Sequence, residues 1–103
     1  MINHVVLFKL KDYPDAEKAE IVSELKNLLE GLNEKISEVK YIEVGANYEM
    51  NSKSYDIALL SHFETAEDLD KYRVHPEHLK VLERVKETTA ERAAVDYFFN
   101  PDK

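Results

Sequence analysis

The sequence contains no cysteine. This absence excludes a disulfide framework, a thiolate nucleophile and a cysteine-based zinc site. The chain also lacks an apolar run of the roughly 18 residues that a membrane span requires. Its amino terminus passes directly into a strand-like segment, without the basic stretch and cleavage site of a secretory signal. We therefore expect a cytoplasmic protein without a membrane partner.

Positive charge is scarce, because 14 basic residues face 21 acidic residues and the formal net charge is -7. The resulting field repels phosphate backbones, so we expect no nucleic-acid partner. The length of 103 residues, with 44% hydrophobic and 34% charged residues, is typical of one folded domain spanning residues 1–103. The chain has no Gly-rich phosphate loop, nucleophile elbow or zinc-protease helix motif.

The hydrophobic pattern predicts the order strand, helix, strand, strand, helix, strand. The strands are expected at residues 2–10, 36–48, 55–63 and 93–99, and residues 47–54 are expected to form a hairpin loop. A long helix enters at Pro14, carries an apolar stripe and ends near Gly31 and Asn33. Gly45 suggests a bulge or a close backbone approach in the second strand. This order is that of a ferredoxin-like α+β fold, whose antiparallel sheet commonly has the strand order 4-1-3-2.

The second helical segment is expected to be broken at Pro76. Thr65 resembles the first residue of a capping box, with Asp68 in the third following position. Pro76 disfavours helical geometry at His75 but fits the first turn of a new helix. The stripe of that new helix is expected to comprise Leu79, Leu82 and Val85.

The strands are apolar on both faces. The first strand carries Val6 and Phe8 on one parity and Val5 and Leu7 on the other. Helices cover only one face of a ferredoxin-like sheet, so the other face needs a cover that this short chain does not supply. A second copy of the chain is therefore the expected partner, in a homodimer.

The densest functional signal is the segment from Tyr72 to His78, in which Tyr72, His75 and His78 gather around the helix restart. The spacing of three places the imidazoles of His75 and His78 at neighbouring positions on a helix surface. A histidine can act as a general base and a tyrosine hydroxyl can stabilise an oxyanion. The alternative is that His75 caps the helix and His78 packs at its rim. A metal site would need a third ligand, which we cannot assign.

His4 and Asp96 lie in neighbouring expected strands, where neither residue type is typical. Pairing would hold the imidazole in one tautomer, as a catalytic base requires, but a buried structural pair is the more frequent arrangement. Aromatic side chains could line a cavity, although most are expected in the core or an interface: Tyr13, Tyr41, Tyr48, Tyr55, Tyr97, Phe8, Phe63, Phe98 and Phe99.

Four short segments together resemble a known family. They are His4 to Lys9, Tyr55 to Leu59, Tyr72 with His75-Pro76-x-His78, and Val95-Asp96-Tyr97. In this order they are similar to the stress-responsive A/B barrel (Dabb) domain, over essentially the whole chain. The resemblance implies a dimeric α/β barrel built from two ferredoxin-like sheets, which agrees with the two-sided strands.

An enzymatic member of that family, a plant polyketide cyclase, closes a linear chain by aldol condensation. The resemblance implies that its catalytic His and Tyr correspond to His78 and Tyr72, with His4 and His75 matching other pocket histidines. Ile57 stands where that cyclase has a further histidine. A plant member binds magnesium, but no ligand set can be placed here.

The leading hypothesis is therefore a pocket bordered by His4, Tyr72, His75, His78 and Asp96 that binds a small, partly apolar carbonyl compound. If it is catalytic, the step is of the cyclase, isomerase or lyase type and uses no organic cofactor. The alternatives are a non-catalytic stress or assembly protein and, with less support, an oxygen-using monooxygenase.

Overall fold

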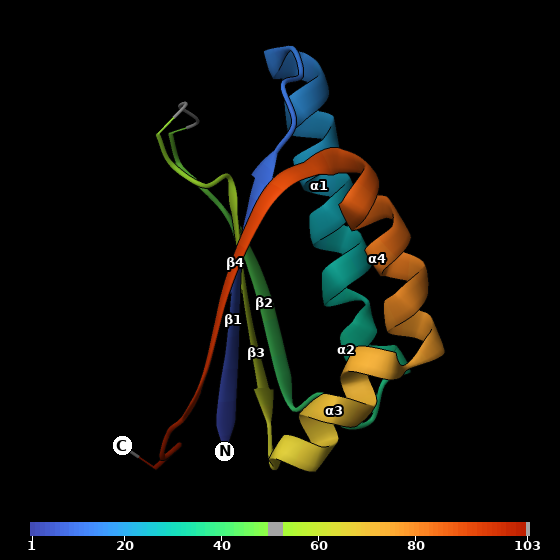
Figure 1. Ribbon diagram of the computed structural model, residues 1–103, viewed down its shortest axis with the longest axis vertical. Helices are drawn as coiled ribbons and strands as arrows, with labels where there is room; N and C mark the ends of the chain where they lie inside the picture. The colour runs from blue at the N-terminus through green and yellow to red at the C-terminus, as the bar shows by residue number, and fades with distance from the viewer. Residues whose placement is uncertain (50–52, 103) are drawn as a thin grey trace.

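The computed structural model describes residues 1–49 and 53–102 and contains a four-stranded antiparallel sheet with the strand order β2-β3-β1-β4. The elements are β1 (Ile2–Leu10), α1 (Asp15–Glu30), α2 (Leu32–Lys35), β2 (Tyr41–Ala46), β3 (Ile57–Phe63), α3 (Ala66–Val74), α4 (Pro76–Thr88) and β4 (Thr89–Phe98). The helices all lie on one face of the sheet, and no helix or strand of the described residues covers the opposite face (Figure 1). This topology confirms the predicted ferredoxin-like fold.

β1 is a central strand, and its side chains alternate between two environments. Val6 and Phe8 are buried on the face that the helices cover. Val5 and Leu7 are only half-buried, because they point to the opposite face. The register places Leu60 of β3 and Val95 of β4 on either side of Val5, and Val95 is 56% exposed. The open face is therefore an apolar surface, as the sequence predicts.

The helical layer packs on the other face and is held together by side chains from α1 and α4. α1 buries Ile21, Leu25 and Leu29, which recur at helical spacing. Arg84 of α4 forms two hydrogen bonds with Glu24 of α1, of 2.8 and 2.9 Å. These contacts fix α4 beside α1, above the sheet.

The predicted break between the two helices after β3 is confirmed. The hydroxyl of Thr65 accepts a hydrogen bond from the N–H of Asp68 at 3.1 Å, which caps α3. α3 ends at Val74, the extended backbone of His75 follows, and Pro76 begins α4. Because Pro76 restarts the helix immediately, the last turn of α3 and the first turn of α4 remain close together.

The second strand differs from the prediction, because β2 is shorter than residues 36–48. The N–H of Ile36 bonds to the carbonyl of Leu32, and that of Val39 bonds to the carbonyl of Ile36. These turn bonds, which follow the short helix α2, satisfy backbone groups that a longer strand would have placed in the sheet. The predicted bulge at Gly45 is also wrong, since its pairing with β3 is continuous. The register shift lies instead in β1, between Lys9 and Leu10.

Two further boundaries differ. β3 starts at Ile57. β4 starts at Thr89, directly after α4, because its pairing with β1 continues through residues 89–92, a mostly polar segment that has no apolar strand signal. On α4, Leu79 is 48% exposed and Val81 is buried, so the predicted stripe is wrong at its first position.

The predicted loop at 47–54 includes residues 50–52, which lie outside the described residues. No helix among the described residues has the length and apolar character to cross a membrane.

Asp56 stabilises the end of the sheet beside the register shift in β1, and its substitution should measurably destabilise the fold. Its side chain is fully buried, and one carboxylate oxygen accepts a hydrogen bond from the N–H of Leu10 at 2.8 Å. Asp56→Ala leaves that N–H buried without an acceptor, so we expect a loss of about 1–3 kcal/mol in urea unfolding. Asp56→Asn retains an acceptor and should lose less. Equal stabilities of the wild type and Asp56→Ala would contradict this account.

Candidate functional site

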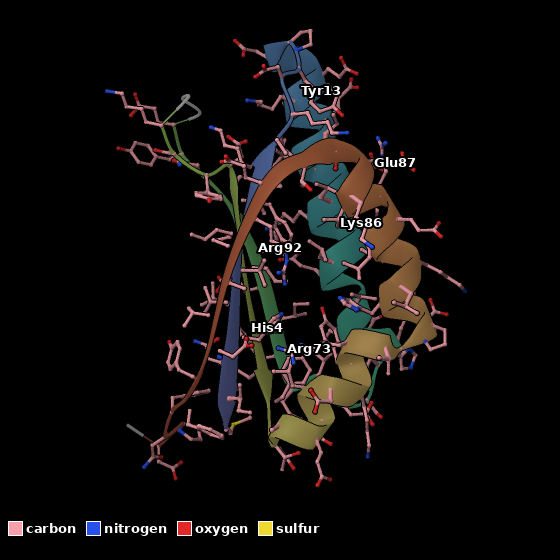
Figure 2. The ribbon with its side chains drawn as sticks, viewed as in Figure 1. His4, Tyr13, Arg73, Lys86, Glu87 and Arg92 are labelled. Carbon is pink, nitrogen blue, oxygen red and sulfur yellow. The ribbon has the colours of Figure 1, made fainter. Side chains whose placement is uncertain are left out.

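A cavity of about 350 Å³ lies between the covered face of the sheet and the helices. Its lining comprises His4, Val6, Phe8, Leu29, Leu59, Arg73, His78, Leu82, Val85, Lys86, Thr89 and Arg92. Figure 2 shows His4 on the sheet with Arg73 beside it, and Arg92 and Lys86 further along the space between β4 and α4. The cavity has an apolar body, two histidines and several cationic side chains.

The periodicity of two elements explains why these side chains meet. His78, Leu82 and Lys86 recur at intervals of four residues, and Val85 and Thr89 form a second such row beside them, which places all five on one side of α4 and its end. His4, Val6 and Phe8 alternate along β1 and therefore share the covered face of the sheet. The cavity is thus the space between one helical stripe and one strand face.

His4 is paired with Asp96, as the sequence suggested. The two residues are directly opposite each other in the β1–β4 register, and the Nδ1 atom of His4 is hydrogen-bonded to a carboxylate oxygen of Asp96. The other carboxylate oxygen of Asp96 accepts a hydrogen bond from Arg73 at 2.7 Å. Because a carboxylate accepts, the proton of the neutral His4 ring lies on Nδ1 and its Nε2 atom carries a lone pair.

His78 is held by the backbone of the preceding helix. Its Nδ1 atom lies 3.1 Å from the carbonyl oxygen of Arg73. A carbonyl can only accept, so this bond requires a proton on Nδ1 and leaves Nε2 of the neutral ring as an acceptor. The ring of His78 also packs on that of Tyr72, with 4.3 Å between centroids. The break at Pro76 makes this possible, because it returns α4 to the last turn of α3.

Burial keeps both cavity histidines neutral near pH 7. Burial lowers the pKa of His4 below 6.5, opposed by the hydrogen bond and charge of Asp96 and assisted by the charges of Arg73 and Arg92. Burial also lowers the pKa of His78, opposed by its hydrogen bond to the Arg73 carbonyl and assisted by the charge of Arg92. A neutral imidazole with an available lone pair can accept a proton.

Tyr72 lies beneath the histidines rather than at the cavity wall. Its side chain is fully buried and also contacts Phe63, with 4.9 Å between ring centroids. Its hydroxyl has no hydrogen-bond partner among the described residues, and burial raises its pKa to about 12. Tyr72 therefore supports the ring of His78 and retains an unused donor. Its predicted role toward an oxyanion stays a prediction.

His75 stands outside the cavity lining. Its Nδ1 atom accepts a hydrogen bond from the N–H of Glu77 at 3.1 Å, so the ring caps the start of α4. The capping interpretation of His75 is thus confirmed. Among the described residues, no group of three or more His, Cys, Asp or Glu side chains is arranged to hold a metal ion. Of the aromatic side chains proposed for a cavity, Phe8 is in this lining.

Sequence reasoning missed Arg73, Lys86 and Arg92. All three side chains are exposed to solvent, yet they also line the cavity. The signal was available in the spacing: Arg92 has the same parity in β4 as Asp96, and Lys86 lies eight residues after His78 on α4. Both positions follow from the periods of a strand and a helix.

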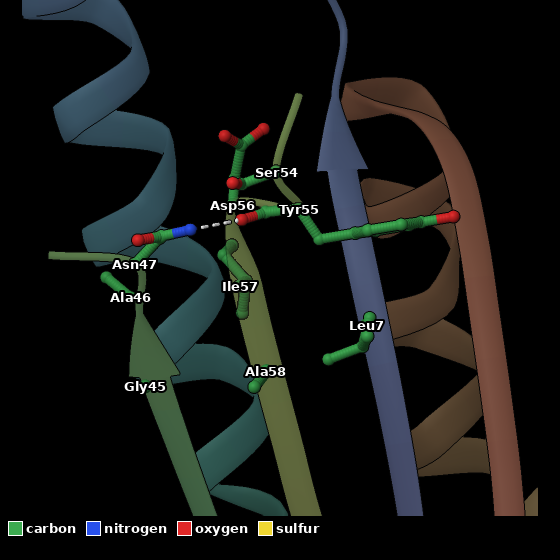
Figure 3. A pocket seen from close by; sticks show the side chains of 9 residues that line it. All are labelled: Leu7, Gly45, Ala46, Asn47, Ser54, Tyr55, Asp56, Ile57 and Ala58. Carbon is green, nitrogen blue, oxygen red and sulfur yellow. Dashed lines mark hydrogen bonds between the residues drawn. The ribbon is translucent and has the colours of Figure 1, made fainter. Parts of the chain in front are cut away.

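A larger hollow, of about 520 Å³, lies at the far ends of β2 and β3, beside Leu7 (Figure 3). Two of its polar side chains already bond to the backbone: Asn47 donates to the carbonyl of Tyr55 at 2.9 Å, and Asp56 accepts from Leu10. No histidine or cationic side chain is in its described lining. We therefore take the histidine-lined cavity as the candidate site, because it alone of the two combines depth with groups that can move a proton.

The fold and the cavity define a ferredoxin-like domain with room for a small molecule. Residues 2–99 match the model of a protein family, Dabb, described as the stress responsive A/B barrel domain. The chain therefore belongs to the Dabb family, as its sequence motifs suggested.

Three relatives place this family membership in context. The stress-response A/B barrel domain-containing protein DABB1 of Arabidopsis thaliana is 28% identical over 102 residues, which cover 94% of this chain and 46% of that protein. The chain thus spans about half the length of this relative. A dimeric ferredoxin-like protein from Bacteroides fragilis is 42% identical, with a TM-score of 0.85 and 95% of both chains covered. A hydroxynitrile lyase from Passiflora edulis has a TM-score of 0.73 over 97% of this chain and 94% of its own, but at 16% identity it shows only the shared fold.

The pairing with Asp96 should raise the pKa of His4, which makes the pair testable by titration. Asp96→Asn removes the negative charge but keeps an oxygen that can accept from Nδ1, so we expect the pKa of His4 to fall further below its wild-type value. NMR titration of the imidazole signals measures this shift. Asp70→Asn is the control, since Asp70 bonds to Arg73 at 3.2 Å on the exposed side and should leave His4 almost unchanged. An unchanged or higher pKa in Asp96→Asn would refute the assignment.

Proposed function

We propose that this domain binds a small, partly apolar carbonyl compound in the histidine-lined cavity, and that His78 removes a proton from the carbon beside the carbonyl. The observation that carries the proposal is the placement of two neutral imidazoles, each with an acceptor nitrogen, at an apolar cavity. A cavity of about 350 Å³ is of the size that encloses a small organic molecule.

The proposed step uses only the chain's own groups. The C–H electron pair moves into an enolate as the proton passes to the Nε2 atom of His78, and the bond from its Nδ1 to the Arg73 carbonyl keeps the ring oriented. The enolate oxygen needs a donor, which we assign to Tyr72. Its buried hydroxyl has no other partner among the described residues, and a turn of the His78 ring that packs on Tyr72 would open that hydroxyl to the cavity. Return of the proton or attack of the enolate on a second carbonyl gives isomerase or cyclase chemistry.

His4, Asp96 and His75 have supporting roles in this proposal. Asp96 orients His4 at the cavity wall. The Nε2 atom of His4 can then accept a hydrogen bond from a substrate hydroxyl. His75 fixes the start of the helix that carries His78. The second candidate function is a non-catalytic stress or assembly protein. It is favoured by the hydrogen bond from the N–H of Glu77 to His75, because that bond caps a helix and so has a structural role.

We further propose that two copies associate through the open face of the sheet. Val5, Leu7, Leu60 and Val95 leave this face apolar, and a second identical sheet would cover it. The relative from Bacteroides fragilis is described as dimeric, which supports self-association.

Replacement of His78 should strongly slow proton abstraction without closing the cavity. We expect deuterium incorporation from D₂O into the neutral ketones propiophenone and 5-oxo-5-phenylpentanamide, measured by NMR, to slow by about 10²–10⁴-fold in His78→Gln. Lys80→Gln is the control on the same helix, since Lys80 is 72% exposed and lies outside the lining. Tyr72→Phe should slow exchange while ligand affinity stays constant. Binding without any exchange in the wild type would favour the non-catalytic function.

Disruption of the open face should give a monomer. Leu60→Lys places a charge at the centre of the proposed interface, where its desolvation opposes association. Sedimentation velocity should therefore show a dimer for the wild type and a monomer for Leu60→Lys. Leu79→Lys, at a 48% exposed position on α4, should remain dimeric. A monomeric wild type or a dimeric Leu60→Lys variant would disprove this mode of association.

A further inference from the structure

The candidate cavity gathers positive charge in a chain that is negative overall. Arg73, Lys86 and Arg92 all line it, whereas no acidic side chain is among its described lining residues. The chain as a whole has a formal net charge of -7. A concentration of cations in a concave, partly apolar space attracts anions, because the low-dielectric walls strengthen the local field.

Two of these cations have no partner in the described part of the chain. Arg73 is bonded to Asp96 at 2.7 Å and to Asp70 at 3.2 Å, so its charge is largely compensated. Lys86 and Arg92 form no ion pair or hydrogen bond with the residues that the structure describes. Their charge is therefore available to a ligand.

The nearest acidic residues in the chain do not compensate them. Glu87, next to Lys86, is bonded to Arg84 at 3.1 Å. Glu91, next to Arg92, has the opposite parity in β4 and pairs in register with Lys9 on the open face of the sheet. The uncompensated charge is thus local to the cavity, and Figure 2 shows Arg92 and Lys86 in the space between β4 and α4.

The two free cations lie at the same end of the cavity, away from the histidines. Arg92 is opposite Phe8, four residues along β1 from His4, which corresponds to about 13 Å of strand. Lys86 is eight residues along α4 from His78, which corresponds to about 12 Å of helix. The side chains of Val6, Phe8, Leu82 and Val85 line the space between the two ends. The cavity is therefore polar at both ends and apolar in the middle.

From this arrangement we infer that the ligand of the cavity is an oxo acid, whose carboxylate is bound by Arg92 and Lys86 while its carbonyl end lies at the histidines. The guanidinium group of Arg92 binds a carboxylate through paired hydrogen bonds, and the ammonium of Lys86 adds a point charge. The apolar chain of the oxo acid lies along the apolar middle. This inference rests on the proposed function, because it names the substrate class of the same site.

Calorimetric titration with a matched pair of ligands tests the inference. The pair is 5-oxo-5-phenylpentanoate and its neutral amide, which differ at the anionic end alone. Three methylene groups separate the carbonyl from the carboxylate, and the long side chains of Arg92 and Lys86 span the rest of the distance, since the charge of Arg92 already reaches both histidines. We expect the wild type to bind the acid at least about tenfold more tightly than the amide, and 0.5 M NaCl to reduce this preference. Arg92→Gln and Lys86→Gln should each reduce the preference while the affinity for the amide stays constant. Lys80→Gln should preserve the preference.

The outcomes separate this inference from the proposed function. Equal affinities for the acid and the amide in the wild type, or a preference that survives both Arg92→Gln and Lys86→Gln, overturn the oxo-acid inference and leave a site for neutral carbonyl compounds. Binding of neither ligand overturns both. Circular dichroism and urea unfolding of each variant confirm that a lost preference reflects lost charge rather than lost fold.

Discussion

The alternation of side chains along β1 is the constraint on which this structure depends. As the central partner of both β3 and β4, β1 directs Val6 and Phe8 toward the helices and Val5 and Leu7 toward the open face. A shift of one residue in the register of β1 would turn Val5 and Leu7 toward the helices and leave Val6 and Phe8 on the open face. The same register places His4 opposite Asp96. The core, the cavity floor and the apolar open face therefore all follow from one strand.

The second determinant is the interruption between α3 and α4. A continuous helix would carry His78 away from Tyr72 along a straight axis, since successive turns are separated by 5.4 Å. Pro76 instead begins a new helix beside the end of the old one, and the Arg73 carbonyl near that end is bonded to His78. The hydrogen bond thus satisfies a helix-terminal carbonyl and orients an imidazole at the same time.

Much of the fold could be predicted from the sequence, because its signals are local. The strand alternation, the Thr65 cap and the Pro76 restart each depend on a few neighbouring residues, and the structure confirms them. The start of β4 could not be predicted in this way. Its first residues are polar and join the sheet because β1 offers unpaired backbone groups beside them, which is a tertiary effect.

The candidate site was predictable in part for the same reason. His4 and Asp96 stand out because histidine and aspartate are unusual in strands, and His78 stands out because it clusters with Tyr72 and His75 at the helix restart. The structure brings His4 and His78 to one cavity. Lys86 and Arg92 did not stand out, since a charged residue on a helix or an edge strand normally faces solvent. Their spacing relates them to Asp96 and His78, and the packing of α4 over β1 and β4 brings both into the cavity with the histidines.

The charges and the histidines of the cavity are physically coupled. In the free protein, burial and the positive charge of Arg92 both disfavour the protonated form of His4 and His78, so the imidazoles remain acceptors. An anion bound at Arg92 and Lys86 would offset that positive charge and raise the proton affinity of both rings. The occupied cavity would then favour the transfer of a proton to His78 more than the empty one does. A carboxylate at one end of the cavity would in this way assist proton abstraction at the other.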